Sequence, residues 1–254
     1  MILINFLKKV YEFVDDDTPY YAASLSFFTI FALLPIIALI IWFVSSMEFL
    51  KEHSELLLHY LLDLINPIHS ERINTFINNF LVNSDSLGSI GIIYLIFVFT
   101  MFFKDYEYIV NKIHNVPNRP LYQSMFVYLL LLLIIPIIFG IFIFSISFTS
   151  DNLSIKVLTF LFIWVLFMII FKISINRKIS LIALLSSSFI TLTALTITKS
   201  LFIQYILLNT TYTTLYGSFS AILFFILWIY ISWIIYLYGM KLCHTINTKE
   251  IHKV

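Results

Sequence analysis

The chain has 254 residues, of which 61% are hydrophobic, 18% aromatic and 11% charged, and its formal net charge is +1. Water-soluble globular domains carry about a quarter charged residues and under half apolar ones, so this composition excludes a soluble domain and predicts an all-α, polytopic membrane protein. The near-neutral charge excludes the basic face of a nucleic-acid-binding protein, and the single Cys243 excludes an intrachain disulfide framework and a multi-cysteine metal site.

Charge-free stretches locate the membrane spans, since a spanning helix needs about 20 apolar residues. We predict a single membrane domain, 1–254, with six transmembrane helices. Their expected limits are about 21–46, 87–103, 121–148, 158–175, 179–206 and 216–242. Asp15, Asp16 and Asp17 precede the first span, where acidic side chains complement the helix dipole; cation binding is the alternative.

The distribution of basic residues predicts the orientation of these spans. The N-terminus, the 104–120 and 172–178 segments and the C-terminus together hold 11 of the 15 Lys and Arg residues. The positive-inside rule therefore predicts that both termini are cytoplasmic.

The segment 47–86, between the first two spans, is the one sizeable outer loop. Its apolar residues recur at helical spacing in two runs, separated by Asn66-Pro67. The runs consist of Leu58, Leu61, Leu62 and Ile65, and then Ile73, Phe76, Ile77, Phe80 and Leu81. We predict two short amphipathic helices that lie on or dip into the outer leaflet. In an equally simple interpretation they cap the helix bundle.

The fifth predicted span contains the candidate binding residues. Lys199 is a charged residue near its outer end, which either extends its amine to the membrane interface or faces an internal cavity and binds an anionic headgroup. Ser187, Thr191 and Thr198 share one helical face with Ala194. This small polar stripe indicates close helix packing or a substrate path. Tyr205 completes the candidate set.

Four residues are candidates for gating or packing. Pro35 and Pro136 lie inside predicted helices, where each removes a backbone hydrogen bond and permits a kink. Gly217, at the start of the sixth span, is expected to let that helix begin close to a neighbour, and Gly239 to allow close packing near its end.

No residue pattern indicates catalysis, a resident metal or a cofactor. Glu55, His59 and Asp63 share a helical face in the outer segment, but with no further ligand a solvated polar stripe is the expected interpretation. Gly217-Ser218 resembles part of a serine-nucleophile motif, yet no intramembrane base is placed beside it. We therefore predict that the protein is not an enzyme.

Three stretches carry a resemblance to a known family. These are "DDDTPYYAASLSFFTIFALLP" (15–35), "GSIGIIYLIFVFTMFFKDYEYIVNKIHNVPNRP" (88–120) and "YGSFSAILFFILWIYISWIIYLYGMKL" (216–242). Together, in this order, they resemble the YihY/virulence factor BrkB family of bacterial inner-membrane proteins. The chain departs from the family pattern at His114, where Trp is usual, and at Met240-Lys241, which replaces Ala-Glu.

The resemblance implies a six-helix protein of the bacterial inner membrane without an agreed biochemical activity. An older ribonuclease label of that family has no support in these residues. The leading hypothesis is transport or flipping of a lipid-like or amphiphilic cell-envelope component, with membrane lipids as partners. The alternatives are a non-catalytic scaffold for envelope-assembly proteins, with envelope proteins or further copies of the chain as partners, and an intramembrane enzyme.

Overall fold

The computed structural model describes residues 17–46, 71, 73–75, 79, 88–146, 152–208, 214 and 216–251. Over these residues the secondary structure is helical, without a strand, which agrees with the predicted all-α class. The long helices are α2 (Thr18–Ser46), α6 (Gly88–Ile113), α7 (Leu121–Ile146), α8 (Asn152–Ser174), α9 (Leu181–Leu208) and α11 (Ser220–Ile251), with a 3₁₀ turn η2 (Gly217–Phe219) before α11. Long apolar runs favour helices because a helix satisfies its own backbone hydrogen bonds in lipid.

Three helices in the described part of the chain are long and apolar enough to cross a membrane. They are Ser154–Ser174, Leu181–Leu208 and Ser220–Glu250, and Leu121–Leu131 is a shorter apolar helical stretch. These three correspond to the fourth, fifth and sixth predicted spans. That all six cross the membrane stays a prediction.

Several helices extend beyond the limits expected for the membrane spans. Helix α6 continues ten residues beyond the expected end at 103, and α11 extends to Ile251 instead of ending near 242. Helices α2 and α8 begin earlier than expected, at Thr18 and Asn152. The prediction located the spans by charge-free stretches, but a helix continues past a charge when that side chain has a partner or reaches water.

A Schellman motif ends α6 and determines the path of the following loop. Asn115 adopts a left-handed conformation with φ 52°. Its N–H donates to the Lys112 carbonyl at 3.2 Å, and the Val116 N–H donates to the Asn111 carbonyl at 3.0 Å, which is the hydrogen-bond pattern of that motif. Pro120 then precedes α7 and accepts the backbone N–H groups of Gln123 and Ser124. The loop thus holds Arg119 between two helix ends.

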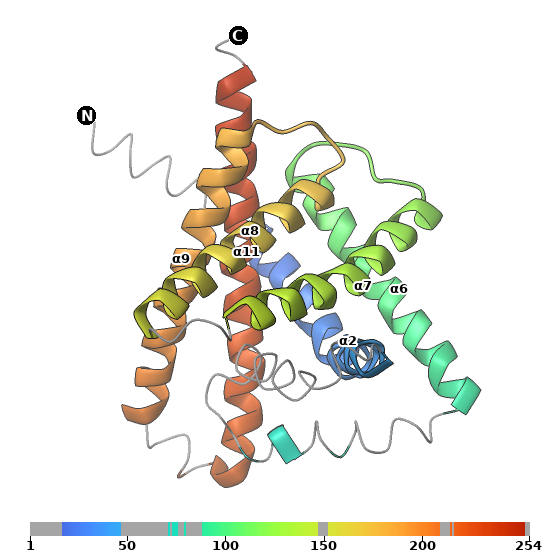
Figure 1. Cartoon of the computed structure of the whole chain (residues 1–254), viewed down its shortest axis with the longest axis vertical. Helices are drawn as coiled ribbons and strands as arrows, with labels where there is room; N and C mark the ends of the chain where they lie inside the picture. The colour runs from blue at the N-terminus through green and yellow to red at the C-terminus, as the bar shows by residue number, and fades with distance from the viewer. Residues whose placement is uncertain are drawn as a thin grey trace.

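Helices α9 and α11 run side by side along the longest axis of the molecule (Figure 1), and α11 also packs against α2. Helix α2 packs on α6, and α8 packs on α9, whereas α7 and α8 contact each other little. The ends of α6 and α8 and the loops after them lie at one end of the bundle (Figure 1).

The core lies where α6, α8, α9 and α11 meet, with contributions from α2 and α7, and aromatic side chains fill much of it. Tyr106, Tyr128 and Phe171 are fully buried there. The Trp233 indole N–H of α11 donates to Thr29 Oγ1 of α2 at 2.8 Å, and Trp228 packs against Phe202. Both tryptophans therefore join helices inside the bundle.

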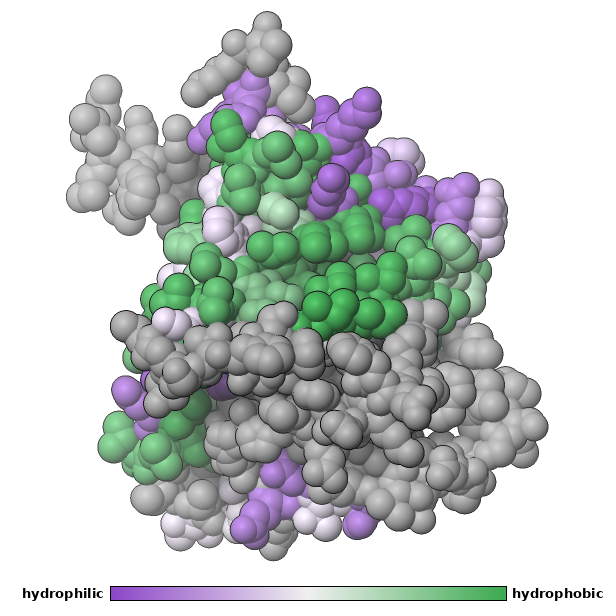
Figure 2. All heavy atoms as spheres, in the orientation of Figure 1, coloured by the Kyte–Doolittle hydropathy of each residue, from purple (hydrophilic) through white to green (hydrophobic). Residues whose placement is uncertain are grey.

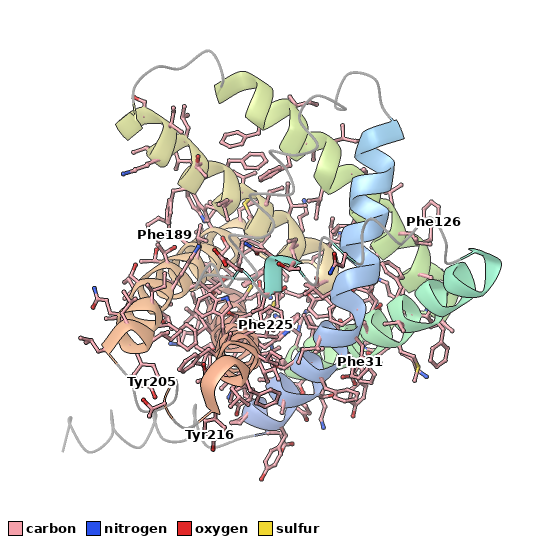
Figure 3. The ribbon with its side chains drawn as sticks, turned by 90° about the horizontal axis from the view of Figure 1, so that it is seen from below. Phe31, Phe126, Phe189, Tyr205, Tyr216 and Phe225 are labelled. Atoms are coloured by element: carbon pink, nitrogen blue, oxygen red, sulfur yellow. The ribbon has the colours of Figure 1, made fainter. Side chains whose placement is uncertain are left out.

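The outer surface of the bundle is strongly apolar. Figure 2 shows a hydrophobic band over α7 and α8, with hydrophilic residues gathered directly above it, over the loops that follow α6 and α8. The ring of Phe126 projects outward from α7 (Figure 3). Such a band beside a polar cap is typical of a protein surrounded by lipid.

Some sequence predictions concern residues outside the described ranges. Asp15 and Asp16, the metal candidate of Glu55, His59 and Asp63, and nearly all of the 47–86 segment belong to this group. Asp17 is described: its carbonyl accepts the Tyr21 backbone N–H at 3.0 Å, and its carboxylate accepts the Tyr21 hydroxyl at 3.2 Å. Asp17 thus lies at the N-terminus of α2, as the helix-dipole interpretation requires.

Candidate functional site

The structure places the predicted binding residues along α9 but does not assemble them into a site. Lys199 and Thr198 are partly buried, and the Tyr205 ring meets Phe224 edge to face, with centroids 6.5 Å apart. Ser187 and Thr191 are buried, and their hydroxyls donate to carbonyls of their own helix, those of Ala183 and Ser187. Of the pockets described below, none is lined by these residues.

The gating and packing candidates have different surroundings. Gly239 of α11 lies directly against Thr191 of α9: a Cβ at Gly239 would come within 1.9 Å of Thr191 Oγ1. The expectation for Gly217 was wrong, since a Cβ there would meet no atom within 4 Å; this glycine is needed instead for its φ of +50°. Pro35 and Pro136 lie in the interiors of α2 and α7.

The structure instead assembles a polar cluster around Arg119 at one end of the bundle. Glu107 and Asn111 lie one turn apart on α6 and are 2% and 0% exposed. Glu107 Oε1 accepts the Arg119 backbone N–H at 3.0 Å and the Asn111 amide at 3.4 Å, and it lies 4.0 Å from Arg119 Nη1. The buried carboxylate is therefore held by the loop that follows its own helix.

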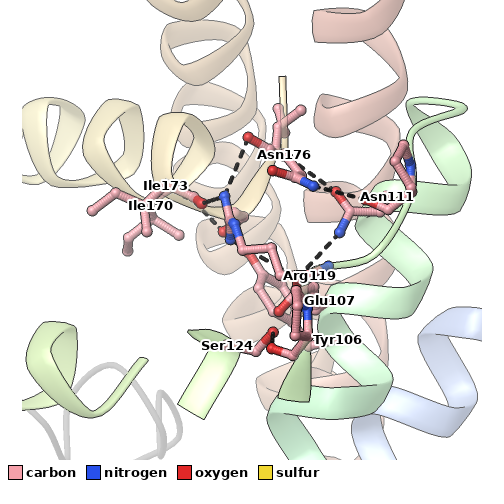
Figure 4. Close-up of polar contacts among 12 residues, drawn as sticks. Tyr106, Glu107, Asn111, Arg119, Ser124, Ile170, Ile173 and Asn176 are labelled. Atoms are coloured by element: carbon pink, nitrogen blue, oxygen red, sulfur yellow. Dashed lines mark hydrogen bonds and ion pairs between the residues drawn. The ribbon is translucent and has the colours of Figure 1, made fainter. Parts of the chain in front are cut away.

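The Arg119 guanidinium connects this loop to α8. Its Nη2 donates to the carbonyl oxygens of Ile173 at 2.7 Å and Ile175 at 3.5 Å, at the C-terminal end of α8 (Figure 4). The last carbonyls of a helix have no partner within the helix, and a cation there also complements the helix dipole. Arg119 thus satisfies the end of α8 while its charge compensates Glu107.

Two asparagines complete the connection. Asn111 Oδ1 accepts the Asn176 backbone N–H at 3.1 Å, and the Asn176 amide donates to the Pro117 carbonyl at 2.9 Å (Figure 4). Because buried polar groups are costly unless hydrogen-bonded, this network holds the loops after α6 and α8 in one arrangement.

A cluster of hydroxyl groups lies beside this network. The Tyr106 hydroxyl contacts Ser174 Oγ at 2.7 Å and the Tyr236 hydroxyl at 2.5 Å. On the other side of α6, Ser24 of α2 donates to Asp105 at 2.6 Å. These bonds tie α6 to α8, α11 and α2 near the same end of the molecule.

His114 lies in the turn after α6, and its imidazole ring is buried. Its Nδ1 lies 3.0 Å from the Val110 carbonyl, and its ring meets the His244 ring edge to face. Burial, followed by the nearby His244 and Arg177 charges, lowers the pKa of His114 to about 4, against a backbone hydrogen bond that raises it. The imidazole is therefore neutral at pH 7.

Arg119 lines several pockets, of which two bear on the site. The first, of about 450 Å³, is polar and contains both signs of charge, from Lys104, Asp105, Glu107 and Arg119. The second, of about 580 Å³, is an apolar groove between α7 and α8. Apart from Arg119 and Lys172, its lining is apolar: Phe126, Val127, Leu130, Leu131, Ile134, Ile135 and Ile138 from α7, and Leu166, Ile169, Ile170 and Ile173 from α8. We call it the α7/α8 groove.

The groove opens sideways, toward the surroundings of the bundle. Phe126, Leu130 and Ile134 lie four residues apart on one face of α7 and are 68%, 47% and 40% exposed. A cleft lined by apolar side chains with polar groups at one end suits an amphiphilic molecule. Among the described residues, no group of three His, Cys, Asp or Glu side chains could hold a metal ion.

Sequence reasoning missed the main residues of this site. Asn111 entered the sequence analysis only within the family stretch 88–120, Arg119 also as a basic residue of the 104–120 segment, Lys172 as one of the 172–178 segment, and Glu107 was assigned to a loop. The Glu107 to Asn111 spacing, with apolar Ile109 and Val110 between them, is a signal for a polar pair on a buried helix. That Arg119 is the partner of this pair depends on the tertiary fold and not on the spacing.

Comparison with known proteins gives one consistent result. The family model described as virulence factor BrkB matches residues 10–253. A UPF0761 membrane protein from Haemophilus influenzae is 27% identical over 89% of this chain and 88% of its own length, and one from Actinobacillus pleuropneumoniae is 25% identical over 91% and 89%. Another from Haemophilus influenzae is 30% identical over 71% of this chain and 72% of the relative. No solved structure matches the chain.

Proposed function

The chain belongs to the virulence factor BrkB family, as the sequence resemblance predicted, and from this premise we propose that it moves a lipid-like or amphiphilic molecule within the bacterial inner membrane. That it is an integral membrane protein follows from its apolar helices and from the membrane proteins to which it is similar. We also propose that both termini are cytoplasmic and that the protein is not an enzyme.

The observation that carries the proposal is the α7/α8 groove. A lipid in the surrounding leaflet can enter it from the side, because the exposed side chains of α7 leave its wall open. The polar pocket adjoins its end, since both pockets are lined by Arg119. An acyl chain in the groove would therefore place its headgroup at the polar cluster.

Reconstitution into liposomes that carry fluorescent phospholipids tests this proposal. Bleaching of the outer leaflet reports how fast the lipids cross. We expect wild-type protein to accelerate crossing over protein-free liposomes, and Ile169→Trp, which fills the groove, to reduce that acceleration. Val165→Trp is the matched control, because Val165 is an exposed apolar residue one turn away on α8 and does not line the groove.

Two results would count against the proposal. Crossing no faster than in protein-free liposomes, for any headgroup used, would contradict movement of phospholipid. A loss with Val165→Trp equal to that with Ile169→Trp would exclude the groove as the route. The competing scaffold function predicts no lipid crossing and stable capture of envelope proteins that Ile169→Trp leaves unchanged.

A further inference from the structure

The charged residues of the α7/α8 groove are both cations and both lie at the same end. Lys172 is two residues before the end of α8, and Arg119 is two residues before the start of α7. The 2.7 Å bond from Arg119 to the Ile173 carbonyl brings the guanidinium to the last turn of α8, which also carries Lys172. Among the described residues that line the groove, none is acidic.

The two cations differ in how their charge is balanced. Arg119 is mostly buried and lies beside the Glu107 carboxylate, which offsets its charge. Lys172 is exposed and forms no hydrogen bond or ion pair within the described part of the chain. The mouth of the groove therefore keeps about one net positive charge where the lining changes from apolar to polar.

The apolar lining of the groove extends far from its cationic end. From Phe126 to Ile138 the α7 lining extends over twelve residue steps, which is about 18 Å along a helix. Helices α7 and α8 cross the long axis of α9 and α11 obliquely (Figure 1). An acyl chain that starts at the cationic end can therefore follow the groove in contact with apolar side chains over about 18 Å.

We propose that the α7/α8 groove binds a membrane lipid with an anionic headgroup, which contacts Lys172 and Arg119 while an acyl chain lies against the apolar lining. A phosphodiester oxygen accepts hydrogen bonds from an ammonium or a guanidinium group. A zwitterionic lipid would bring its own cation toward the two basic residues, so the groove favours the anionic lipid. The inference rests on the groove of the proposed function, and it concerns binding alone.

Photocrosslinking in proteoliposomes tests the headgroup preference. Phosphatidylglycerol and phosphatidylcholine with the same diazirine acyl chain are compared, and the labelled peptides are identified by mass spectrometry. One basic residue near a membrane surface contributes enough attraction for about a fivefold preference. We expect phosphatidylglycerol to label the groove segments of α7 and α8 about fivefold more than phosphatidylcholine.

Variants assign the preference to the groove. Lys172→Ala is expected to bring the labelling ratio close to one, and Lys172→Arg to retain it. Lys156→Ala is the matched control, because Lys156 is an exposed lysine at the other end of the same helix; it should leave the ratio unchanged. Exposed Lys172 carries little folding energy, and an unchanged melting temperature of Lys172→Ala excludes misfolding as the cause.

Each other outcome is decisive. Equal labelling by the two lipids, or the same ratio in Lys172→Ala and wild type, would overturn the proposal. Displacement of phosphatidylglycerol by millimolar glycerol phosphate would show a site for soluble phosphate compounds instead of lipid. Selective labelling without lipid crossing would refute the proposed transport but support this binding site. Lipid crossing without selective labelling would support transport but refute the anionic-lipid site.

Discussion

Arg119→Ala is the substitution expected to cost most at the polar cluster. It removes the hydrogen bonds to the Ile173 and Ile175 carbonyls and leaves the Glu107 carboxylate, which is 2% exposed, without its guanidinium. Loss of one partner from a buried ion pair costs about 3–5 kcal/mol, mostly because the other charge stays buried. We expect the free energy of unfolding to fall by about this amount.

A double-mutant cycle separates the charge from the helix-capping bonds. Glu107→Gln keeps an oxygen that can accept the backbone N–H of residue 119 but removes the charge. The free energy of unfolding of the double variant should therefore be about 1–3 kcal/mol higher than the sum of the two single effects predicts. Equilibrium unfolding in bicelles measures each free energy. Arg177→Ala is the matched control, an exposed arginine in the adjacent loop whose loss should change stability by less than about 0.5 kcal/mol.

Additive effects of the two substitutions, to within about 0.5 kcal/mol, would contradict this prediction. A cost of Arg119→Ala no larger than that of Arg177→Ala would contradict it as well. Either result would mean that the buried carboxylate does not depend on this guanidinium in the folded protein.

Three further predictions concern single residues. Because His114 has an ordinary pKa of about 6.5 lowered to about 4 in the folded chain, the unfolded state binds more protons between these values. Stability should therefore fall by up to about 3 kcal/mol as the pH drops from 6.5 to 4, and a slope that His114→Phe does not reduce in pH-dependent unfolding would contradict this. Gly239→Ala should destabilise the α9–α11 contact by about 1–3 kcal/mol through overpacking. Thermal unfolding should show partial rescue by Thr191→Gly, which removes the Oγ1, Cβ and Cγ2 atoms that the new Cβ would meet, and a neutral Gly239→Ala would refute the contact. Gly217→Ala should cost only about 1 kcal/mol, from its positive φ without a steric clash, and a loss as large as that of Gly239→Ala in the same assay would show that a neighbour packs there.

The positions of the helices could be predicted from the sequence because they depend on local composition. A charge-free apolar run must hydrogen-bond within itself in lipid, and the predicted limits of the first, third and fifth spans lie within a few residues of the ends of α2, α7 and α9. The same rule failed at the end of α6, where Lys104 and Asp105 lie inside the helix and not at its boundary. Their side chains are accommodated by the packing of α2 and by a polar pocket, which a local rule does not include.

The candidate site was beyond local reasoning for a related reason. Lys199 was the charged residue nearest to a predicted membrane interior, whereas the charges that the fold brings together are Glu107, Arg119 and Lys172. Arg119 contacts a carbonyl 54 residues away in the chain, and no periodicity in the sequence identifies that partner.

The sequence by itself therefore determined a membrane protein of this family, its helical class and the approximate extent of its helices, since hydrophobicity and helix length act within each segment. Only the tertiary structure decided that α7 and α8 stand apart, that a groove lies between them, and that two cations meet at its end. The physical reason is that the stability of a buried charge depends on which helix ends surround it, and this is determined by packing between segments distant in the chain.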